Sequence, residues 1–314
     1  MLIIDYSTKK SIREAFGKKL ALLGRENSNL VVLDADLSCS TQTKIFAQEF
    51  PDRFFNVGIA EQNMISTAAG LALVGKIAFA ASFAVFATGR TYDQIRSSVC
   101  YQKANVKIIG THGGITVGED GATHQALEDV SLMRGLPGMM VIVPADCNEC
   151  EQILDFAAKY EGPVYIRLSR NSLPNIYSSD YKFNPYKANI LQEGTDVTLV
   201  SNGDLLAEVC EAANLLKQKG VNAEVISLPV VKPLDSKTIL DSAKKTKLVV
   251  TVENHSILGG IGSAICELLS ESLPTRVLRI GMNDTFGQSG TPADLLKYYG
   301  LDAESIANRI IDAI

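Results

Sequence analysis

The chain has 314 residues, of which 46% are hydrophobic and 21% charged, so it contains enough apolar material for more than one buried core. At roughly 150 residues per domain, this length predicts two domains. A net charge of -5, without any cluster of lysine and arginine, argues against a nucleic-acid partner. Six scattered cysteines favour reduced thiols in a cytoplasmic protein over a disulfide framework.

Neither a signal peptide nor a membrane span is expected. The first six residues lack a charged start and a long apolar core. Residues 68–87 are about as long as a spanning helix. Lys76 stands near the middle of that stretch, beside Gly75. The stretch is therefore predicted to be a buried helix, a turn and a buried strand.

Short apolar runs alternate with helical patterns through the first half of the chain. Strands are expected at residues 30–34, 54–57, 77–81, 106–110, 139–143 and 164–168. Helices are expected at residues 11–23, 42–49, 61–73, 88–101, 127–133 and 146–160, the last with Asp146 as N-cap and Glu149 as its reciprocal partner. This alternation predicts a mostly parallel sheet with helices on both faces.

The second half repeats this kind of alternation after a change of character. Polar residues, asparagines and prolines make residues 173–192 an expected irregular linker. Strands follow at residues 197–201, 223–228, 248–253 and 277–280, and helices at 205–219, 236–244, 263–270 and 303–314. The fold class is therefore α/β with two doubly wound domains, residues 1–172 and 193–314.

Two short motifs have ordinary interpretations. Cys147 and Cys150 have redox-motif spacing, but they lie at a helix start with no second pair and no nearby histidine, so a zinc site is not expected. Residues 259–262, Gly-Gly-Ile-Gly, precede a helix but lack the full dinucleotide fingerprint. They could seat an anion, although close helix packing is the preferred interpretation.

The residues best suited to chemistry lie between residues 55 and 125. Glu61 precedes an almost uncharged helix rich in small side chains, which lets another element approach closely. His112 and His124 occupy a glycine-rich segment with Glu119 and Asp120. In a parallel sheet, Glu61, His112 and also Asp36 would fall at the carboxyl ends of strands, where ligands gather. Each residue alone has an ordinary explanation, and phenylalanines in such a stretch usually pack in a core.

Taken together and in order, these segments resemble the transketolase family. The matching segments are Val-Gly-Ile-Ala-Glu-Gln-Asn-Met at 57–64, the phenylalanine-bearing run at 79–86, Gly-Glu-Asp-Gly-Ala-Thr-His-Gln at 118–125 and Ile-Arg-Leu-Ser-Arg at 166–170. The resemblance covers nearly the whole chain and corresponds to the C-terminal half of the enzyme as a separate chain. It implies a thiamin-diphosphate-binding fold at residues 1–172 and a transketolase C-terminal-like domain at 193–314.

The resemblance also implies a cofactor. In this family thiamine diphosphate lies across a subunit interface, and the domain seen here grips its aminopyrimidine ring. Glu61 matches the glutamate that bonds the ring nitrogen and drives the formation of the reactive tautomer. Phe83 and Phe86 match the aromatic residues that pack on the ring, with Phe79 expected nearby, and Asp36 matches an aspartate of the cofactor region.

The same comparison assigns the substrate site. His112, Asp120 and His124 match positions that meet the sugar's hydroxyls and the end of the acceptor, and the two histidines join Glu61 as catalytic candidates. Arg170 matches the arginine that binds the substrate's phosphate, because a bidentate fork suits an anion. Ser40 and Lys9 are further phosphate candidates, although the family pattern has arginine where Lys9 is placed in this comparison.

One family motif is missing. The diphosphate and its divalent metal, Mg²⁺ or a similar ion, are held by a Gly-Asp-Gly motif followed at a distance by asparagine, on the N-terminal domain; no such motif occurs here. The expectation is half an active site without a metal ligand, completed by an N-terminal partner subunit, with two copies of each chain and self-association through the pyrimidine-binding domain.

The expected reaction is transfer of a two-carbon ketol unit from a ketose phosphate to an aldose phosphate. Three alternatives stay open: a chain like 1-deoxyxylulose-5-phosphate synthase, a beta-type subunit of a 2-oxo acid dehydrogenase, and a non-catalytic transketolase-like scaffold.

Overall fold

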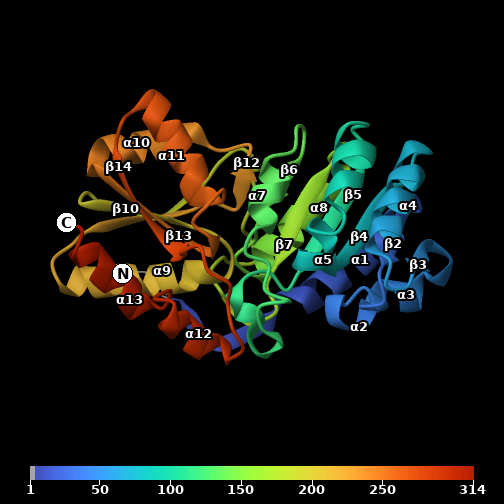
Figure 1. Cartoon of the computed structure of the whole chain (residues 1–314), viewed down its shortest axis with the longest axis horizontal. Coiled ribbons are helices and arrows are strands. Elements are labelled where there is room, and N and C mark those ends of the chain that lie inside the picture. Colours follow the sequence, from blue (N-terminus) through green and yellow to red (C-terminus); the bar gives the residue numbers. More distant parts are fainter. Residues whose placement is uncertain (1–3) are drawn as a thin grey trace.

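The computed structural model describes residues 4–314, and within them the strands form sheets of seven, five and two strands. Figure 1 shows two lobes side by side, with the first half of the chain in blue to green and the second half in yellow to red. Buried apolar clusters lie on both faces of the larger sheet, under helices. The predicted α/β architecture is therefore confirmed.

The larger sheet has the strand order β12-β6-β7-β5-β4-β2-β3. Its parallel strands are β2 (Leu30–Asp34), β3 (Phe54–Asn56), β4 (Ile77–Phe83), β5 (Val106–Thr111), β6 (Met140–Ile142) and β7 (Val164–Leu168). Every residue of β2, β5 and β7 is buried. Burial on both faces explains why these strands are nearly continuous apolar runs in the sequence.

The helices of the first half cover both faces of this sheet. They are α1 (Ile12–Glu26), α2 (Ser38–Thr41), α3 (Lys44–Glu49), α4 (Glu61–Leu73), α5 (Ala84–Thr88), α6 (Tyr92–Gln94), α7 (Asp129–Arg134) and α8 (Cys147–Lys159). Helices α1 and α8 pack together on one face, and α4 lies on the other. Short 3₁₀ segments occur at Pro51–Arg53 and Ile115–Asp120 (η3), and a π-helical segment at Ile95–Cys100.

The start of α8 follows the sequence prediction. The side chain of Asp146 accepts a hydrogen bond from the backbone N–H of Glu149 at 2.8 Å, as an N-cap does. Glu149 reaches back to accept from the N–H of Ala145 at 2.8 Å. Burial raises the pKa of Glu149 to about 8. Because both groups satisfy backbone donors that the helix leaves unpaired, these two acidic side chains fix where α8 begins.

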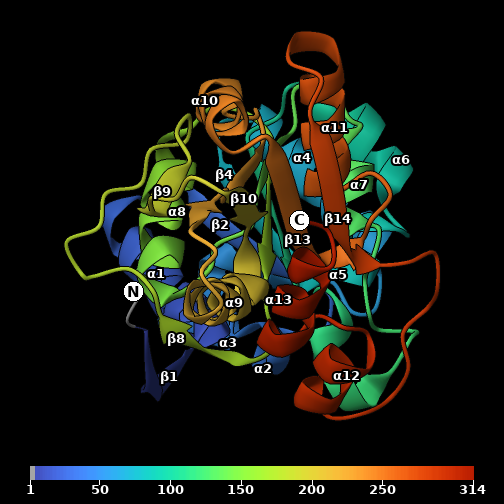
Figure 2. The same ribbon diagram turned by 90° about the vertical axis from the view of Figure 1, so that its left-hand side faces the viewer.

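The second lobe is built on the five-stranded sheet β14-β13-β10-β11-β9. Its parallel strands are β10 (Val197–Ser201), β11 (Ala223–Ser227), β13 (Leu248–Ser256) and β14 (Arg276–Met282), and β9 (Asn189–Gln192) is an antiparallel edge strand. Its helices are α9 (Leu206–Gln218), α10 (Ser236–Thr246), α11 (Ile261–Ser272), α12 (Pro292–Tyr298) and α13 (Ala303–Ile311), with a 3₁₀ segment at Gly203–Leu205. Figure 2 shows α10 and α11 on one side of this sheet and α9 and α13 on the other.

The two lobes are connected by strand pairing as well as by the linker. Strand β12 (Val230–Lys232) belongs to the second half of the chain but pairs antiparallel with β6 in the first sheet. Lys232 reinforces this pairing by donating from Nζ to the backbone oxygen of Arg134 at 2.9 Å. The predicted linker also contains order: β8 (Ser172–Asn175) pairs with β1 (Asp5–Ser11), and β9 joins the second sheet. Such long-range pairings leave no local signal in the sequence.

Buried polar groups join the lobes at their seam. Nε of Arg167, at the end of β7, lies 2.9 Å from Oδ2 of Asp129, and its Nη2 donates to the backbone oxygen of Asn254 at 2.9 Å. The amide of Asn254 donates in turn to Oγ1 of Thr116 at 2.9 Å and to Oδ2 of Asp204 at 3.0 Å. All these side chains are buried or half-buried. The seam is therefore a connected polar network, although Oδ1 of Asp129 has no hydrogen-bond partner among the described residues.

Two helix predictions were wrong in extent. The helix expected at residues 11–23 continues as α1 to Glu26, and Gly24 does not end it but lets Phe46 approach, since a Cβ there would lie 2.6 Å from the Phe46 ring. The helix expected at residues 88–101 is interrupted, with α5 ending at Thr88 and a π-helical segment following α6. Within residues 4–314 no helix is long and apolar enough to span a membrane, and residues 68–87 hold the end of α4, β4 and part of α5.

Candidate active site

Glu61 is the first residue of α4 and is 5% exposed. Its Oε1 atom accepts a hydrogen bond from Nη1 of Arg90 at 3.1 Å. The Arg90 guanidinium also lies over the ring of Phe86, 4.2 Å from its centroid. One half-exposed side chain therefore connects the buried carboxylate to an aromatic face. A carboxylate held in this way can take or give a proton at one fixed point.

Four aromatic rings gather where β4 and β5 end. The ring centroid of Phe83 is 3.8 Å from that of His112 and 5.9 Å from that of Phe86, with interplanar angles of 26° and 12°. His124 meets Phe83 and Phe86 edge-on at 6.2 and 5.4 Å. The structure thus brings four residues expected in the site into one cluster. Phe86 is half-buried and Phe83 is 7% exposed.

Phe79 is not part of that cluster. Its ring is fully buried in the apolar core formed with α1, among Ile12, Phe16 and Leu20. A ring without an exposed face cannot stack on a cofactor, so the structure does not place Phe79 with Phe83 and Phe86. Its aromatic character reflects core packing, the usual role of phenylalanine in a buried strand.

His112 is buried and held in an unusual backbone conformation, with φ of 59°. Its Nδ1 atom is 2.9 Å from Oγ1 of Thr111. Burial lowers the pKa of His112 to about 3, helped by the positive charges of Arg13 and Arg170 and by His124. The imidazole is therefore neutral near pH 7, and a neutral ring has one nitrogen to donate and one to accept a hydrogen bond.

Two arginines lie close together behind His112. Arg13 donates from Nη1 to the backbone oxygen of Ser40 at 2.6 Å and from Nη2 to that of Arg170 at 2.9 Å. Burial and the nearby charge of Arg170 lower the pKa of Arg13. Within residues 4–314, Arg13 has no carboxylate partner and its buried Nε has no hydrogen-bond partner. Nη1 of Arg170 donates a hydrogen bond to the backbone oxygen of Val117. The unpaired guanidinium of Arg13, next to Arg170, is suited to an anion.

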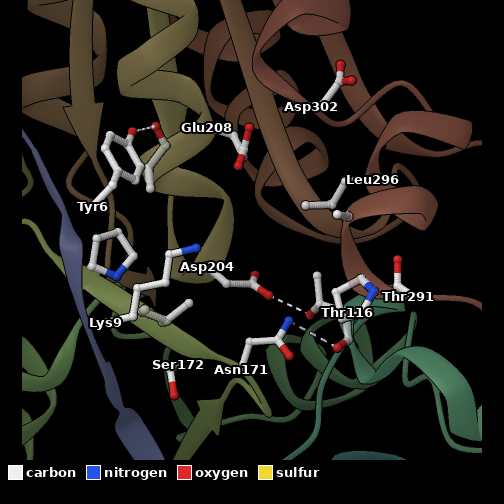
Figure 3. Close-up of a pocket in the computed structure, with 15 residues that line it drawn as sticks. Tyr6, Lys9, Thr116, Asn171, Ser172, Asp204, Glu208, Thr291, Leu296 and Asp302 are labelled. Carbon is white, nitrogen blue, oxygen red and sulfur yellow. Dashed lines mark hydrogen bonds between the residues drawn. The ribbon is translucent and has the colours of Figure 1, made fainter.

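Arg13 was missed by the sequence interpretation, which chose Lys9 instead. Lys9 is exposed on β1 and lines a different cavity, shown in Figure 3, so the structure does not bring it to the arginine pair. The two positions are four residues apart at the boundary between β1 and α1. Ser11 caps α1 by accepting a hydrogen bond from the N–H of Glu14 at 3.3 Å. The cap separates Lys9, on the strand, from Arg13, on the helix.

The remaining candidates lie around this group. Nη1 of Arg170 is 3.1 Å from Oε2 of Glu119 and 3.8 Å from Oδ2 of Asp120, and both carboxylates are exposed. Ser40, in α2, is half-buried. Asp36 is exposed, has φ of 67°, and pairs with the side chain of Asn56, which donates from Nδ2 to Oδ1 at 3.3 Å.

The two motifs with ordinary interpretations are structural. Cys147 and Cys150 are free, buried thiols in α8. The N-terminus of α11, which begins within residues 259–262, has no room for an anion, because the carboxylate of Glu253 already accepts from the N–H groups of Ile261 and Gly262 at 2.9 and 3.0 Å. Within residues 4–314, no three or more His, Cys, Asp or Glu side chains are arranged to hold a metal ion.

Comparison with known proteins identifies both lobes. Residues 8–175 match the family model of the transketolase pyrimidine-binding domain, and residues 186–306 match that of the transketolase C-terminal domain. A protein of Methanocaldococcus jannaschii described as a transketolase C-terminal section is 50% identical, over 96% of each chain. The 6-deoxy-6-sulfo-D-fructose transketolase subunit SqwH of Clostridium sp. strain MSTE9 is 42% identical, over 94% of this chain and 92% of that protein.

A solved structure indicates the same family. The chain of a split-gene transketolase, described as an inactive beta4 tetramer, superposes with a TM-score of 0.90 at 51% identity, over 96% of this chain and 98% of that one. Both domain models and these relatives agree on one family. The chain therefore belongs to the transketolase family, of which it carries the pyrimidine-binding and C-terminal domains.

Proposed function

We propose that this chain is the C-terminal subunit of a split transketolase that transfers a two-carbon ketol unit between sugar phosphates. The observation that supports this most is the arrangement of Glu61 beside Phe86, with Arg90 touching both. A buried carboxylate next to an aromatic face is complementary to an aminopyrimidine, which offers a ring nitrogen and a flat surface. When bound, thiamine diphosphate would supply the nucleophile for the carbon transfer.

Glu61 would hold a proton at the ring nitrogen of the aminopyrimidine. Its position at the first turn of α4 favours a negative charge there, because helix N-termini carry partial positive charge. Phe83 and Phe86 would pack against the ring and exclude water, which strengthens the hydrogen bond to Glu61. Asp36, on the neighbouring loop, would lie at the edge of the cofactor. These residues orient the ring and do not contact the diphosphate.

The sugar would lie between the imidazoles and the arginines. His112 is neutral and its Nδ1 atom is engaged by Thr111, so its Nε2 atom would make a single hydrogen bond to a sugar hydroxyl. His124 and Asp120 would meet the other end of the substrate. Arg170 and Arg13 would bind its terminal anion, with the backbone oxygen of Ser40 in α2 holding Arg13 in place.

A second chain is needed in this proposal. The diphosphate and a divalent metal such as Mg²⁺ would be bound by an N-terminal subunit, in an assembly with two copies of each chain joined partly through the pyrimidine-binding domain. The similar split-gene transketolase supports this, because its structure is described as an inactive tetramer of four beta subunits. The six free cysteines fit a cytoplasmic enzyme.

The anion on the substrate is proposed to be a phosphate. The relative SqwH is named for a sulfonated sugar, and two arginines can bind either a phosphate or a sulfonate by bidentate hydrogen bonds. Pentose phosphates are the proposed substrates, and a matched pair of phosphorylated and sulfonated ketoses would decide between the two anions.

The direct test is reconstitution. Transketolase activity should be absent from this chain alone and appear when it is mixed with an N-terminal subunit, thiamine diphosphate and magnesium. Activity of the chain alone would contradict the half-site proposal. Mixtures that form the complex and bind the cofactor, yet turn over no sugar, would favour the scaffold alternative.

The Glu61→Gln variant tests the catalytic assignment. It removes the charge and keeps the shape, so turnover should fall by at least about a hundredfold, as expected when an acid-base group is lost, while the unfolding midpoint stays near that of the wild type. Glu271→Gln, an exposed carboxylate in α11 of the other lobe, is the matched control and should keep full activity. Normal turnover by Glu61→Gln would refute the assignment.

A further inference from the structure

A cavity of about 520 Å³ lies at the seam between the lobes, with Thr116 of η3 in its wall. Figure 3 shows its walls, which come from β1 and β8 of the first lobe and from α9, α12 and the start of α13 in the second. None of Glu61, Phe83, Phe86 and His112 lines it. Its volume is within the range of small-molecule binding sites.

The charged groups on its walls form few hydrogen bonds or ion pairs within the chain. Lys9 forms no ion pair with any residue from 4 to 314. Glu208 accepts one hydrogen bond, from the N–H of Ala303 at 3.0 Å to Oε2, and Asp302 accepts one, from the N–H of Ser305 at 2.8 Å to Oδ1. Each carboxylate keeps one oxygen without a partner among the described residues. One ammonium and two carboxylate oxygens are thus left for a ligand.

A third carboxylate in the cavity is already satisfied. Oδ2 of Asp204 accepts from Oγ1 of Thr116 at 2.6 Å and from Nδ2 of Asn254 at 3.0 Å. It therefore adds negative charge to the cavity without offering much to a ligand. One lysine against three carboxylates disfavours a sugar phosphate or another anion, because burial of like charges is costly. Burial is also the main cause that raises the pKa of Glu208.

The rest of the wall is apolar. Leu173, Pro174, Ala207 and Leu296 face the same space. A ligand that satisfies all these groups carries an ammonium for the two carboxylates, an anionic group for Lys9 and a short apolar body. Those three features together define a small zwitterion.

We propose that this seam cavity binds an α-amino acid with an apolar side chain. The ammonium lies between Glu208 and Asp302, the carboxylate pairs with Lys9, and the side chain rests on Leu173 and Leu296. Charge-assisted hydrogen bonds of this kind are the strong ones in a partly buried site.

The cavity shares a wall with the candidate active site. Thr116 belongs to η3, and its backbone oxygen accepts from Nδ2 of Asn171 at 3.2 Å, inside the cavity. The other end of η3 carries Glu119 and Asp120, which face Arg170. An amino acid in the cavity would therefore change the KM for the sugar phosphate. This regulatory role depends on the proposed function, whereas binding of the amino acid does not.

The experiment uses the full chain without a partner. Each standard amino acid is titrated into it at millimolar concentrations and binding is measured by calorimetry. At least one apolar amino acid should bind at a single site. Its amine analogue, without the carboxylate, and its acid analogue, without the ammonium, should both bind at least about tenfold more weakly.

Two variants locate the site. Lys9→Met and Glu208→Gln should each weaken binding at least about tenfold without changing the circular dichroism spectrum. Lys10→Met is the matched control, because Lys10 lines a different cavity and its loss should leave the affinity unchanged. Failure of every amino acid to bind, or equal affinity in the Lys9→Met variant, would overturn the proposal. Activity measured without amino acid in the reconstituted enzyme tests the proposed function separately.

Discussion

The seam between the lobes and the face around Glu61 are both polar, but they differ in how far this chain completes them. At the seam, Arg167 is 6% exposed and faces Asp129, which is fully buried. At the other face, Glu61 is equally buried, but its partner Arg90 has a side chain that is 51% exposed. Ile59, two residues before Glu61, is 77% exposed. The chain completes the packing of its seam, whereas the face around Glu61 stays partly exposed, which is the arrangement that the proposed N-terminal subunit would require.

The largest predicted effect is at the seam. Arg167→Met removes one partner of a buried ion pair and leaves the charge of Asp129 uncompensated, which costs about 3–5 kcal/mol. The free energy of unfolding, measured by urea denaturation, should fall by that amount. Lys237→Met removes an exposed pair with Asp241 and serves as the control, with no change in the midpoint. A small loss for Arg167→Met would mean that the seam network contributes little.

The next effect depends on pH. The pKa of His112 is about 3 in the folded chain and about 6.5 when unfolded. Between these values the unfolded state binds the extra proton, so His112 stabilises the fold fully above pH 6.5 and this stabilisation is lost as the pH falls. The loss is up to about 1.4 kcal/mol per pH unit.

His112→Asn isolates this contribution. Between pH 7 and pH 5 the wild type should lose more stability than the variant, because the pH dependence of every other group, including buried His255, is present in both. Thermal unfolding at the two pH values measures the difference. Equal losses would show that His112 is as easily protonated in the folded state as in the unfolded one.

The smallest effect is expected at the face around Glu61. Arg90→Met breaks the contact with Glu61, yet a half-exposed pair contributes at most about 1 kcal/mol to the free energy of unfolding. Urea denaturation should therefore place this variant close to the wild type, with Arg90→Lys between them. A loss as large as that of Arg167→Met would mean that the two regions do not differ in the way described.

Local patterns predicted most of the elements of the fold. The apolar runs of β2, β5 and β7 are continuous because helices cover both faces of the sheet, and this burial is visible in the sequence. The pairing of β12 with β6 and of β1 with β8 could not be predicted. The paired segments are far apart in the chain, and the sequence of one strand does not indicate its partner. Gly24 misled for a similar reason: its neighbours Phe46 and Phe50 lie over twenty positions away.

The candidate site was predicted less evenly. Glu61, Phe83, Phe86, His112 and His124 were predicted because they lie in runs whose order resembles a family, and the structure brings the four rings of this set together. Arg13 was missed because its role depends on Ser40 and Arg170, which are far away in the sequence. Phe79 was predicted beside the other two phenylalanines because a strand pattern does not reveal which ring lies in the core, where the structure places Phe79.

The crossing of β12 has a practical consequence for protein engineering. An excised first half, ending near residue 175, would lose the strand that covers β6 and would present unpaired backbone groups to other molecules. Such an open edge promotes aggregation. A chimaera that exchanges the second half between relatives would also exchange the edge of the first sheet. The two modules that sequence comparison separates are one unit for anyone who wishes to cut or recombine them.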